Sequence, residues 1–155
     1  MHPHYYKTSL EWTGNLGSGT SNYSSYSRNH LIKVPGKTII AGSSDPIFRG
    51  DKSMYNPEDL LVASLSACHM LSYLHLCAIA GIVVIKYTDE ATGTMEETAG
   101  GGGRFTEVNL HPAVTVEDPA MIELAGELHH KAHENCFIAS SCNFPVKHFA
   151  SCIAI

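Results

Sequence analysis

The longest apolar stretch of the chain runs from Leu60 to Ile85 and contains no Asp, Glu, Lys or Arg. The sequence Asn-Pro-Glu-Asp precedes it and has the features of a helix start. Asn56 is a good N-cap, proline suits the first helical position, and the helix dipole favours acidic residues there. Gly81 is a common type of helix end. The pattern therefore predicts a helix over residues 57–81.

Apolar and polar residues alternate on both sides of this helix, which is typical of β-strands. Before the helix, tyrosine-, threonine- and isoleucine-rich segments are separated by the turn sequences GNLGSGT and PG. After the helix, residues 82–97 and 104–118 flank Gly100–Gly103, which predicts a pair of strands joined by a flexible hairpin loop. The earlier strands are expected at residues 5–13, 22–34 and 37–41.

A second helix is expected from Pro119 to Cys136, capped by Asp118, with proline again at the first helical position. The tail, residues 142–155, is expected to form one last strand at a sheet edge, because Pro145 cannot donate to a sheet ladder. The chain has 155 residues, of which 44% are hydrophobic, so we expect one α+β domain over residues 1–155.

The uncharged helix is long enough to cross a bilayer, but polar side chains lie all round it and the nearest upstream charges are acidic, which argues against a membrane span. A helix that is apolar on every side is usually buried on every side. Two helices and a modest sheet cannot cover it completely. This predicts a homodimer with the helix at its centre, and a wholly intramolecular core helix is the alternative.

Composition narrows the function. The formal net charge is -5 and the lysines and arginines are scattered, so we expect no nucleic-acid partner. The five cysteines are an odd number without the spacing of a disulfide scaffold, and the first residues lack a signal-peptide pattern. The chemistry of the chain therefore suits a reducing, cytoplasmic compartment.

Most of the cysteines are expected to be small buried hydrophobes, and this interpretation covers Cys77, Cys142 and Cys152. Cys68 differs because several polar residues share its side of the helix, namely Ser64, Ser72 and His75. Cys136 differs because it lies at the end of the second helix, beside a loop. A thiolate in the middle of a helix needs a nearby cation, for which Arg28 and Arg49 are the candidates.

The sequence NPEDLLVASLSACHM, residues 56–70, resembles the helix motif of the OsmC/Ohr family (osmotically inducible protein C and organic hydroperoxide resistance protein), which reads roughly N-P-E-[EDQ]-L-x-x-A-x-x-[AS]-[AS]-C. The later sequence HENCFIASSCNFPV resembles the family's second cysteine segment, with Phe137 in place of a proline. The resemblance covers nearly the whole chain. It implies an OsmC-like fold, with antiparallel sheets around two central helices in an intertwined homodimer.

The resemblance also implies a thiol-dependent peroxidase, an organic hydroperoxide reductase of the oxidative stress response that needs no cofactor. Cys68 would attack the peroxide, and Cys136 would resolve the resulting sulfenic acid as a Cys68–Cys136 disulfide. The family's glutamate falls on Glu58. Its arginine falls on Arg28 by the spacing of the Ohr branch and near Arg49 by that of the OsmC branch, and we favour Arg28. A dithiol, such as a lipoylated protein, would be the reductant.

Two expectations about this site follow from helix geometry. Glu58 and Cys68 are ten residues apart, or about 15 Å along one helix, so a single arginine that touches both would join residues from two subunits. Cys136 lies near a helix C-terminus, where the dipole disfavours a thiolate, so it suits the thiol that acts second.

Two other functions remain open. His129, His133 and Cys136 share one helix face at spacing suitable for zinc, although solvated histidines on a polar face would give the same pattern. The chain could also bind an apolar ligand without catalysis, its cysteines being structural. In that case no peroxide would be consumed.

Overall fold

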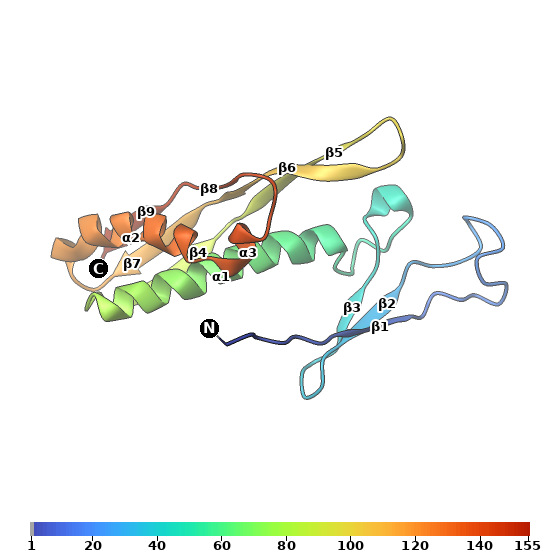
Figure 1. The fold of residues 1–155 in the computed structure, drawn as a ribbon, viewed down its shortest axis with the longest axis horizontal. Helices are drawn as coiled ribbons and strands as arrows, with labels where there is room; N and C mark the ends of the chain where they lie inside the picture. The colour runs from blue at the N-terminus through green and yellow to red at the C-terminus, as the bar shows by residue number, and fades with distance from the viewer. Residues whose placement is uncertain (1) are drawn as a thin grey trace. The chain divides into compact units, whose positions relative to one another are not determined.

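The computed structural model describes residues 2–155, which form two compact units, one ending at Leu61 and the other comprising Val62–Ile155 (Figure 1). Helices and strands alternate along both units, so the expected α+β class is confirmed.

The N-terminal unit is built on a three-stranded antiparallel sheet in the order β1-β2-β3. Its strands are β1 (Ser9–Trp12), β2 (His30–Lys33) and β3 (Ile40–Gly42). Each falls within or at the end of a segment predicted to be a strand, but covers only part of it. A single turn of 3-10 helix, η1 (Pro46–Phe48), lies between β3 and the next helix and ends at Arg49, which has a left-handed backbone with φ 64°.

Helix α1 (Pro57–Ile79) begins where the sequence predicts and ends two residues earlier than predicted. Asn56 Oδ1 accepts from the Asp59 N–H at 2.7 Å, and the Asp59 carboxylate accepts from the Asn56 N–H at 3.3 Å, which is a reciprocal N-terminal cap. Gly81 follows with φ 73°, a conformation that glycine adopts without strain. By length and composition α1 could span a membrane, but core helices of soluble proteins pass the same test.

The C-terminal unit contains two further sheets, each of three strands. One has the order β4-β7-β9, with β4 (Val84–Asp89), β7 (Pro112–Val116) and β9 (Ser151–Ala154). The other has the order β5-β6-β8, with β5 (Thr92–Glu97), β6 (Gly103–Leu110) and β8 (Val146–His148). The pairs β4–β7 and β5–β6 are antiparallel, whereas β6–β8 and β7–β9 are parallel. The parallel pairs are not part of the sequence prediction.

The two long strands predicted around the glycine run are therefore four shorter ones. The break after β4 and the break after β6 lie beside each other, because Asp89 Oδ1 accepts from the backbone N–H of His111 at 2.6 Å. Asp89 Oδ2 also accepts from the Ser66 hydroxyl of α1. The glycine run does form the β5–β6 hairpin loop as expected.

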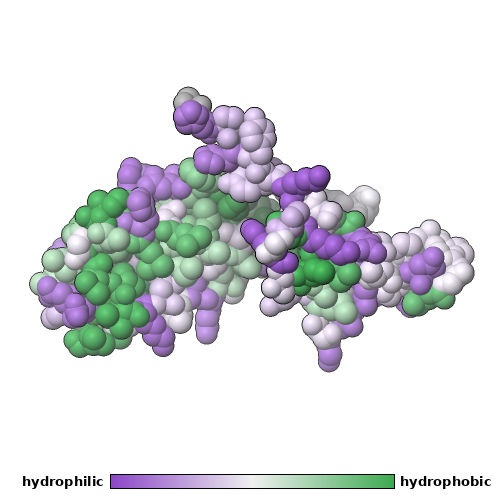
Figure 2. Space-filling view, turned by 90° about the horizontal axis from the view of Figure 1, so that it is seen from below, coloured by the Kyte–Doolittle hydropathy of each residue, from purple (hydrophilic) through white to green (hydrophobic). Residues whose placement is uncertain are grey.

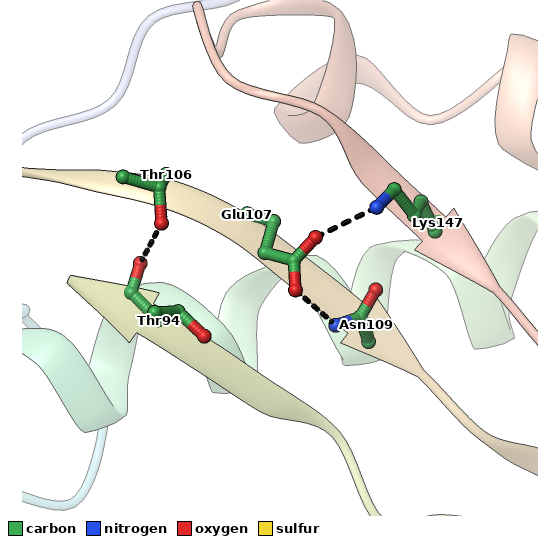
Figure 3. Close-up of polar contacts among 5 residues, drawn as sticks. All are labelled: Thr94, Thr106, Glu107, Asn109 and Lys147. Carbon is green, nitrogen blue, oxygen red and sulfur yellow. Dashed lines mark hydrogen bonds and ion pairs between the residues drawn. The ribbon is translucent and has the colours of Figure 1, made fainter.

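The last part of the chain differs most from the prediction. Asp118 accepts from the Ala120 N–H at 2.8 Å and starts η2 (Pro119–Met121), which leads into α2 (Ile122–Glu134). A short helix, α3 (Phe137–Ser140), follows, and the tail forms β8 and β9 instead of one strand. Lys147 of β8 pairs with Glu107 of β6 at 2.7 Å, which supports the parallel pairing (Figure 3).

The core of the C-terminal unit lies between its sheets and helices. One cluster joins Tyr73 and Cys77 of α1 to Val114 and Val116 of β7 and to α2. The second cluster is built on Leu65, Val108 and Leu110. Only one stripe of α1 is buried, and it comprises Leu65, His69, Tyr73 and Cys77.

The opposite stripe of α1 is exposed in the single chain. It consists of small or apolar residues and one histidine, namely Ala63, Ala67, Leu71 and His75. Leu71 is 63% exposed and Ile79 is 72% exposed. Apolar groups also gather at the surface at the left of Figure 2. One chain therefore does not bury α1 on every side.

Candidate active site

Cys68 and Cys136, the thiol pair, come together in the seam between α1 and α2. Cys68 lies at the middle of α1 and is half-buried, whereas Cys136 follows the end of α2 and is 1% exposed. Burial raises the pKa of Cys136 to about 11, and a hydrogen bond to the Cys68 side chain contributes to this rise. Cys136 therefore keeps its proton and can donate it toward the Cys68 sulfur.

Cys136 follows the C-terminus of α2, as the sequence predicts, but it also starts a further short helix. Cys136 is the N-cap of α3, and its Sγ accepts from the Ala139 N–H at 3.4 Å. Backbone donors at this position favour a thiolate and oppose the rise in pKa. The pKa of Cys136 is raised in the expected direction, and burial is the largest cause, followed by the neighbouring Cys68 thiol.

Arg28 and Glu58, the two other predicted site residues, belong to the N-terminal unit. The Arg28 guanidinium donates to the backbone oxygens of Tyr26 and Tyr23 at 2.6 and 2.7 Å and lies over both rings. The rival Arg49 lies 6.0 Å from the Tyr23 ring. Both candidate arginines therefore lie near the Tyr23 ring. Glu58 lies in the first turn of α1 and is half-buried.

The remaining cysteines lie outside this pair. Cys77 is 1% exposed, and burial raises its pKa, with Tyr73 and Cys152 as its interacting neighbours. Cys142 donates to the Ile138 oxygen at 3.3 Å, and burial raises its pKa. These environments agree with the structural roles expected from the sequence.

His69 and His129, the imidazole pair, lie next to the thiol pair, and sequence reasoning missed them as a pair. Nε2 of His69 lies 3.0 Å from Nδ1 of His129, and each residue is 1% exposed. The interpretation of His129 as part of a solvated polar face is therefore wrong. His69 lies four residues after Leu65 and four before Tyr73, and residues at that spacing share one side of a helix. This pattern could have revealed that His69 is buried.

The spacing that suggested zinc does not produce a metal site. Within residues 2–155, no group of three or more His, Cys, Asp or Glu side chains is arranged to hold a metal ion. The His133 ring lies beside the ring of His148 in β8, with ring centroids 5.8 Å apart. The described residues therefore give no support to the zinc hypothesis.

Known proteins share this fold and part of this sequence. The sequence model of the family described as OsmC-like protein matches residues 50–148. An OsmC-like protein of unknown function from Vibrio cholerae is 30% identical, with a TM-score of 0.85 over 96% of this chain and 100% of that one. An organic hydroperoxide resistance protein from Elizabethkingia anophelis is 25% identical, with a TM-score of 0.71 over 97% and 99% of the two chains.

A third similar structure, an organic hydroperoxide resistance protein from Legionella pneumophila, is 19% identical and shares the fold, with a TM-score of 0.69 over 99% and 100% of the two chains. No curated protein matches the chain. The family match covers more than half of the 155 residues and includes Cys68 and Cys136. The chain belongs to the OsmC-like protein family, which includes organic hydroperoxide resistance proteins.

Proposed function

We propose that this protein is a thiol-dependent peroxidase that reduces organic hydroperoxides. The observation that carries this proposal is the thiol pair, in which two free cysteines from distant parts of the chain interact within one seam. Relatives named as organic hydroperoxide resistance proteins support the same chemistry.

The two thiols differ in a way that supports the proposed order of reaction. Cys136 is buried and retains its proton, whereas Cys68 is half-buried and can meet a peroxide. The Cys68 thiolate attacks the O–O bond, releases an alcohol and becomes a sulfenic acid. Cys136 then attacks that sulfur, forms the Cys68–Cys136 disulfide and releases water. An external dithiol, such as a lipoylated protein, reduces the disulfide in a reducing cytoplasm.

We further propose that the active form is a homodimer and that Arg28 and Glu58 complete the site. The exposed apolar stripe of α1 is a surface that a second copy of the chain can cover. A guanidinium supplies the cation that a mid-helix thiolate needs, and a carboxylate can hold its planar fork. Mixing Glu58→Ala and Cys68→Ser chains should restore activity in heterodimers, and no recovery would contradict a shared site.

The direct test is consumption of cumene hydroperoxide by the purified protein with a dithiol reductant. Cys68→Ser should reduce consumption to the background rate, because no thiolate remains to attack. Cys77→Ser is the matched control, since it makes the same chemical change in the same helix and should retain turnover. If the intact protein gives no turnover with any dithiol, an apolar-ligand-binding protein becomes the better description.

A further inference from the structure

The imidazole pair forms the contact next to the thiol pair in the α1–α2 seam. The rings of His69 and His129 are nearly parallel, with an interplanar angle of 6°, and Nε2 of His69 lies 3.0 Å from Nδ1 of His129. The His129 ring also stacks on Tyr73, with centroids 3.9 Å apart. One imidazole therefore donates to the other, and Tyr73 supports the face of the pair.

This pair is a costly arrangement for a core. In the described part of the chain, His69 Nδ1 and His129 Nε2 are buried without a hydrogen-bond partner. Whichever ring donates, one N–H and one nitrogen lone pair remain unsatisfied, and unsatisfied buried polar groups destabilise a fold. Two apolar side chains would fill the seam without this cost. What a hydrogen bond adds is a fixed distance and direction between the two helices.

Position along the chain connects the imidazole pair to the thiol pair. His69 follows Cys68 directly on α1. Cys136 follows the end of α2, seven residues beyond His129, and both residues are 1% exposed. The distance between α1 and α2 at the imidazoles therefore helps to set the distance between the two sulfurs. Disulfide formation tolerates little error in that distance.

We propose that the His69–His129 hydrogen bond is the positioning contact for the resolving step, because it holds α2 against α1 with Cys136 beside Cys68. The inference rests on the proposed peroxidase function for the sulfenic acid that Cys136 attacks. In that step Cys136 S–H and Cys68 S–OH give one disulfide and one water. In this proposal His69 and His129 act only through the positions of the helices.

The contact should be sensitive to acid. Burial, together with neighbouring histidines, lowers the pKa of His69 to about 4 and that of His129 to about 3, so both are neutral at pH 7. One added proton leaves a donor and an acceptor, but a second proton places two N–H groups face to face and breaks the bond. The other charged or titratable neighbours are His148 of β8, His130 and His133 of α2, and Asp89 of β4.

Two substitutions separate the hydrogen bond from packing. His129→Phe keeps an aromatic ring against Tyr73 but removes Nδ1. The double variant His69→Gln with His129→Asn places amide groups near the positions of Nε2 and Nδ1. Amides can form the same hydrogen bond but do not titrate. The double variant is therefore the conservative rescue, and it should also remove the sensitivity to acid.

The experiment treats each protein with one equivalent of cumene hydroperoxide in the presence of dimedone, which traps sulfenic acids. Intact-protein mass spectrometry then gives the ratio of Cys68–Cys136 disulfide to dimedone adduct. In His129→Phe this ratio should fall by about tenfold, while total oxidation of Cys68 stays the same. In the double variant at pH 7 the ratio should return toward that of the natural protein. An unchanged ratio in folded His129→Phe, or an equal loss of both products, would overturn the inference.

The pH dependence provides the readout that a merely structural role would not give. The ratio of the natural protein should fall below that of the double variant as the pH falls from 4 toward 3, where the second proton binds. Ionisation of the thiols cancels in this comparison, since both proteins carry the same cysteines. If His129→Phe does not fold, this comparison decides, and equal ratios at every pH would overturn the inference.

Diamide, which oxidises dithiols without peroxide, separates this inference from the proposed function. If peroxide leaves Cys68 unmodified but diamide closes the disulfide about tenfold faster in the natural protein than in His129→Phe, the peroxidase proposal fails and the positioning contact stands. Equal closure rates in the two proteins would overturn the positioning contact, whatever peroxide does.

Discussion

Helix α1 carries two cysteines that each face a second cysteine, and the two pairs differ in environment. Cys68 faces Cys136, which has a backbone N–H donor at its sulfur and lies beside a half-buried partner. Cys77 faces Cys152 within the apolar cluster of Tyr73, Val114 and Val116, and burial raises the pKa of both thiols. We refer to Cys77 and Cys152 as the core cysteines.

The difference shows why neighbouring cysteines need not form a redox site. Redox chemistry requires one sulfur that a substrate can reach and a second that is held ready to attack it. Each pair has one half-buried and one buried sulfur, and in the thiol pair the Ala139 N–H of α3 donates to the buried one. Burial in the apolar cluster raises the pKa of both core cysteines, which disfavours the thiolate that attacks a peroxide. The imidazole pair lies between the two regions along α1.

The largest expected difference is in turnover after removal of one cysteine from each pair. Cys136→Ser should lower steady-state peroxide consumption by at least about 100-fold, because an intermolecular thiol must replace a positioned one. Cys152→Ser should leave consumption unchanged. Turnover assays with cumene hydroperoxide and a dithiol measure both. Equal losses in the two variants would remove the distinction between the pairs.

Acid should lower the stability of the fold, because it protonates the imidazole pair, His69 and His129. The folded-state pKa values of His69 and His129 lie below the ordinary value, so the unfolded chain binds more protons than the folded one at low pH. Stability is therefore complete above about pH 6.5 and falls as the pH drops toward 4. The free energy of unfolding should fall by about 3 kcal/mol or more over that range.

Urea titrations at several pH values measure this loss. The matched control is His4→Gln, since His4 is exposed and lies outside the stripe of α1 that a second copy could cover. It should keep the full pH dependence, whereas the double variant His69→Gln with His129→Asn should lose most of it. A profile that is flat between pH 7 and 4 in the natural protein would contradict the burial of two neutral imidazoles.

A core cysteine should matter for stability and not for turnover. Cys77→Ala removes a buried sulfur from the apolar cluster and should cost about 1–2 kcal/mol of unfolding free energy. Peroxide consumption should be unchanged under conditions in which the variant is folded. Cys136→Ala removes the same atoms from a site of the same exposure and should lower turnover by at least about 100-fold, which makes it the matched comparison.

The smallest effect is expected at the start of α1, remote in sequence from both pairs. Asn56→Ala removes the acceptor for the Asp59 N–H and should cost about 1 kcal/mol. Asn56→Asp keeps an acceptor there and should cost less. Thermal unfolding measures both changes, and a loss above that of Cys77→Ala would show that this cap does more than start a helix.

Local signals in the sequence predicted the elements whose causes are local. The cap at Asn56, the glycine after α1, the Asp118-Pro119 start and the glycine hairpin are all present in the structure. The two parallel strand pairs and α3 were missed. The parallel partners are far apart in sequence, and a four-residue helix leaves too little periodicity to detect.

By itself, the sequence determined that α1 is a helix, that Cys68 lies at its middle, and that the chain resembles the OsmC/Ohr family. Only the tertiary structure decided that Cys136 lies beside Cys68, that its proton is held by burial and by that partner, and that His69 and His129 meet across the seam. Helix caps and periodicity are properties of neighbouring residues. Contacts between residues 68 and 136, or 69 and 129, depend on how distant segments pack.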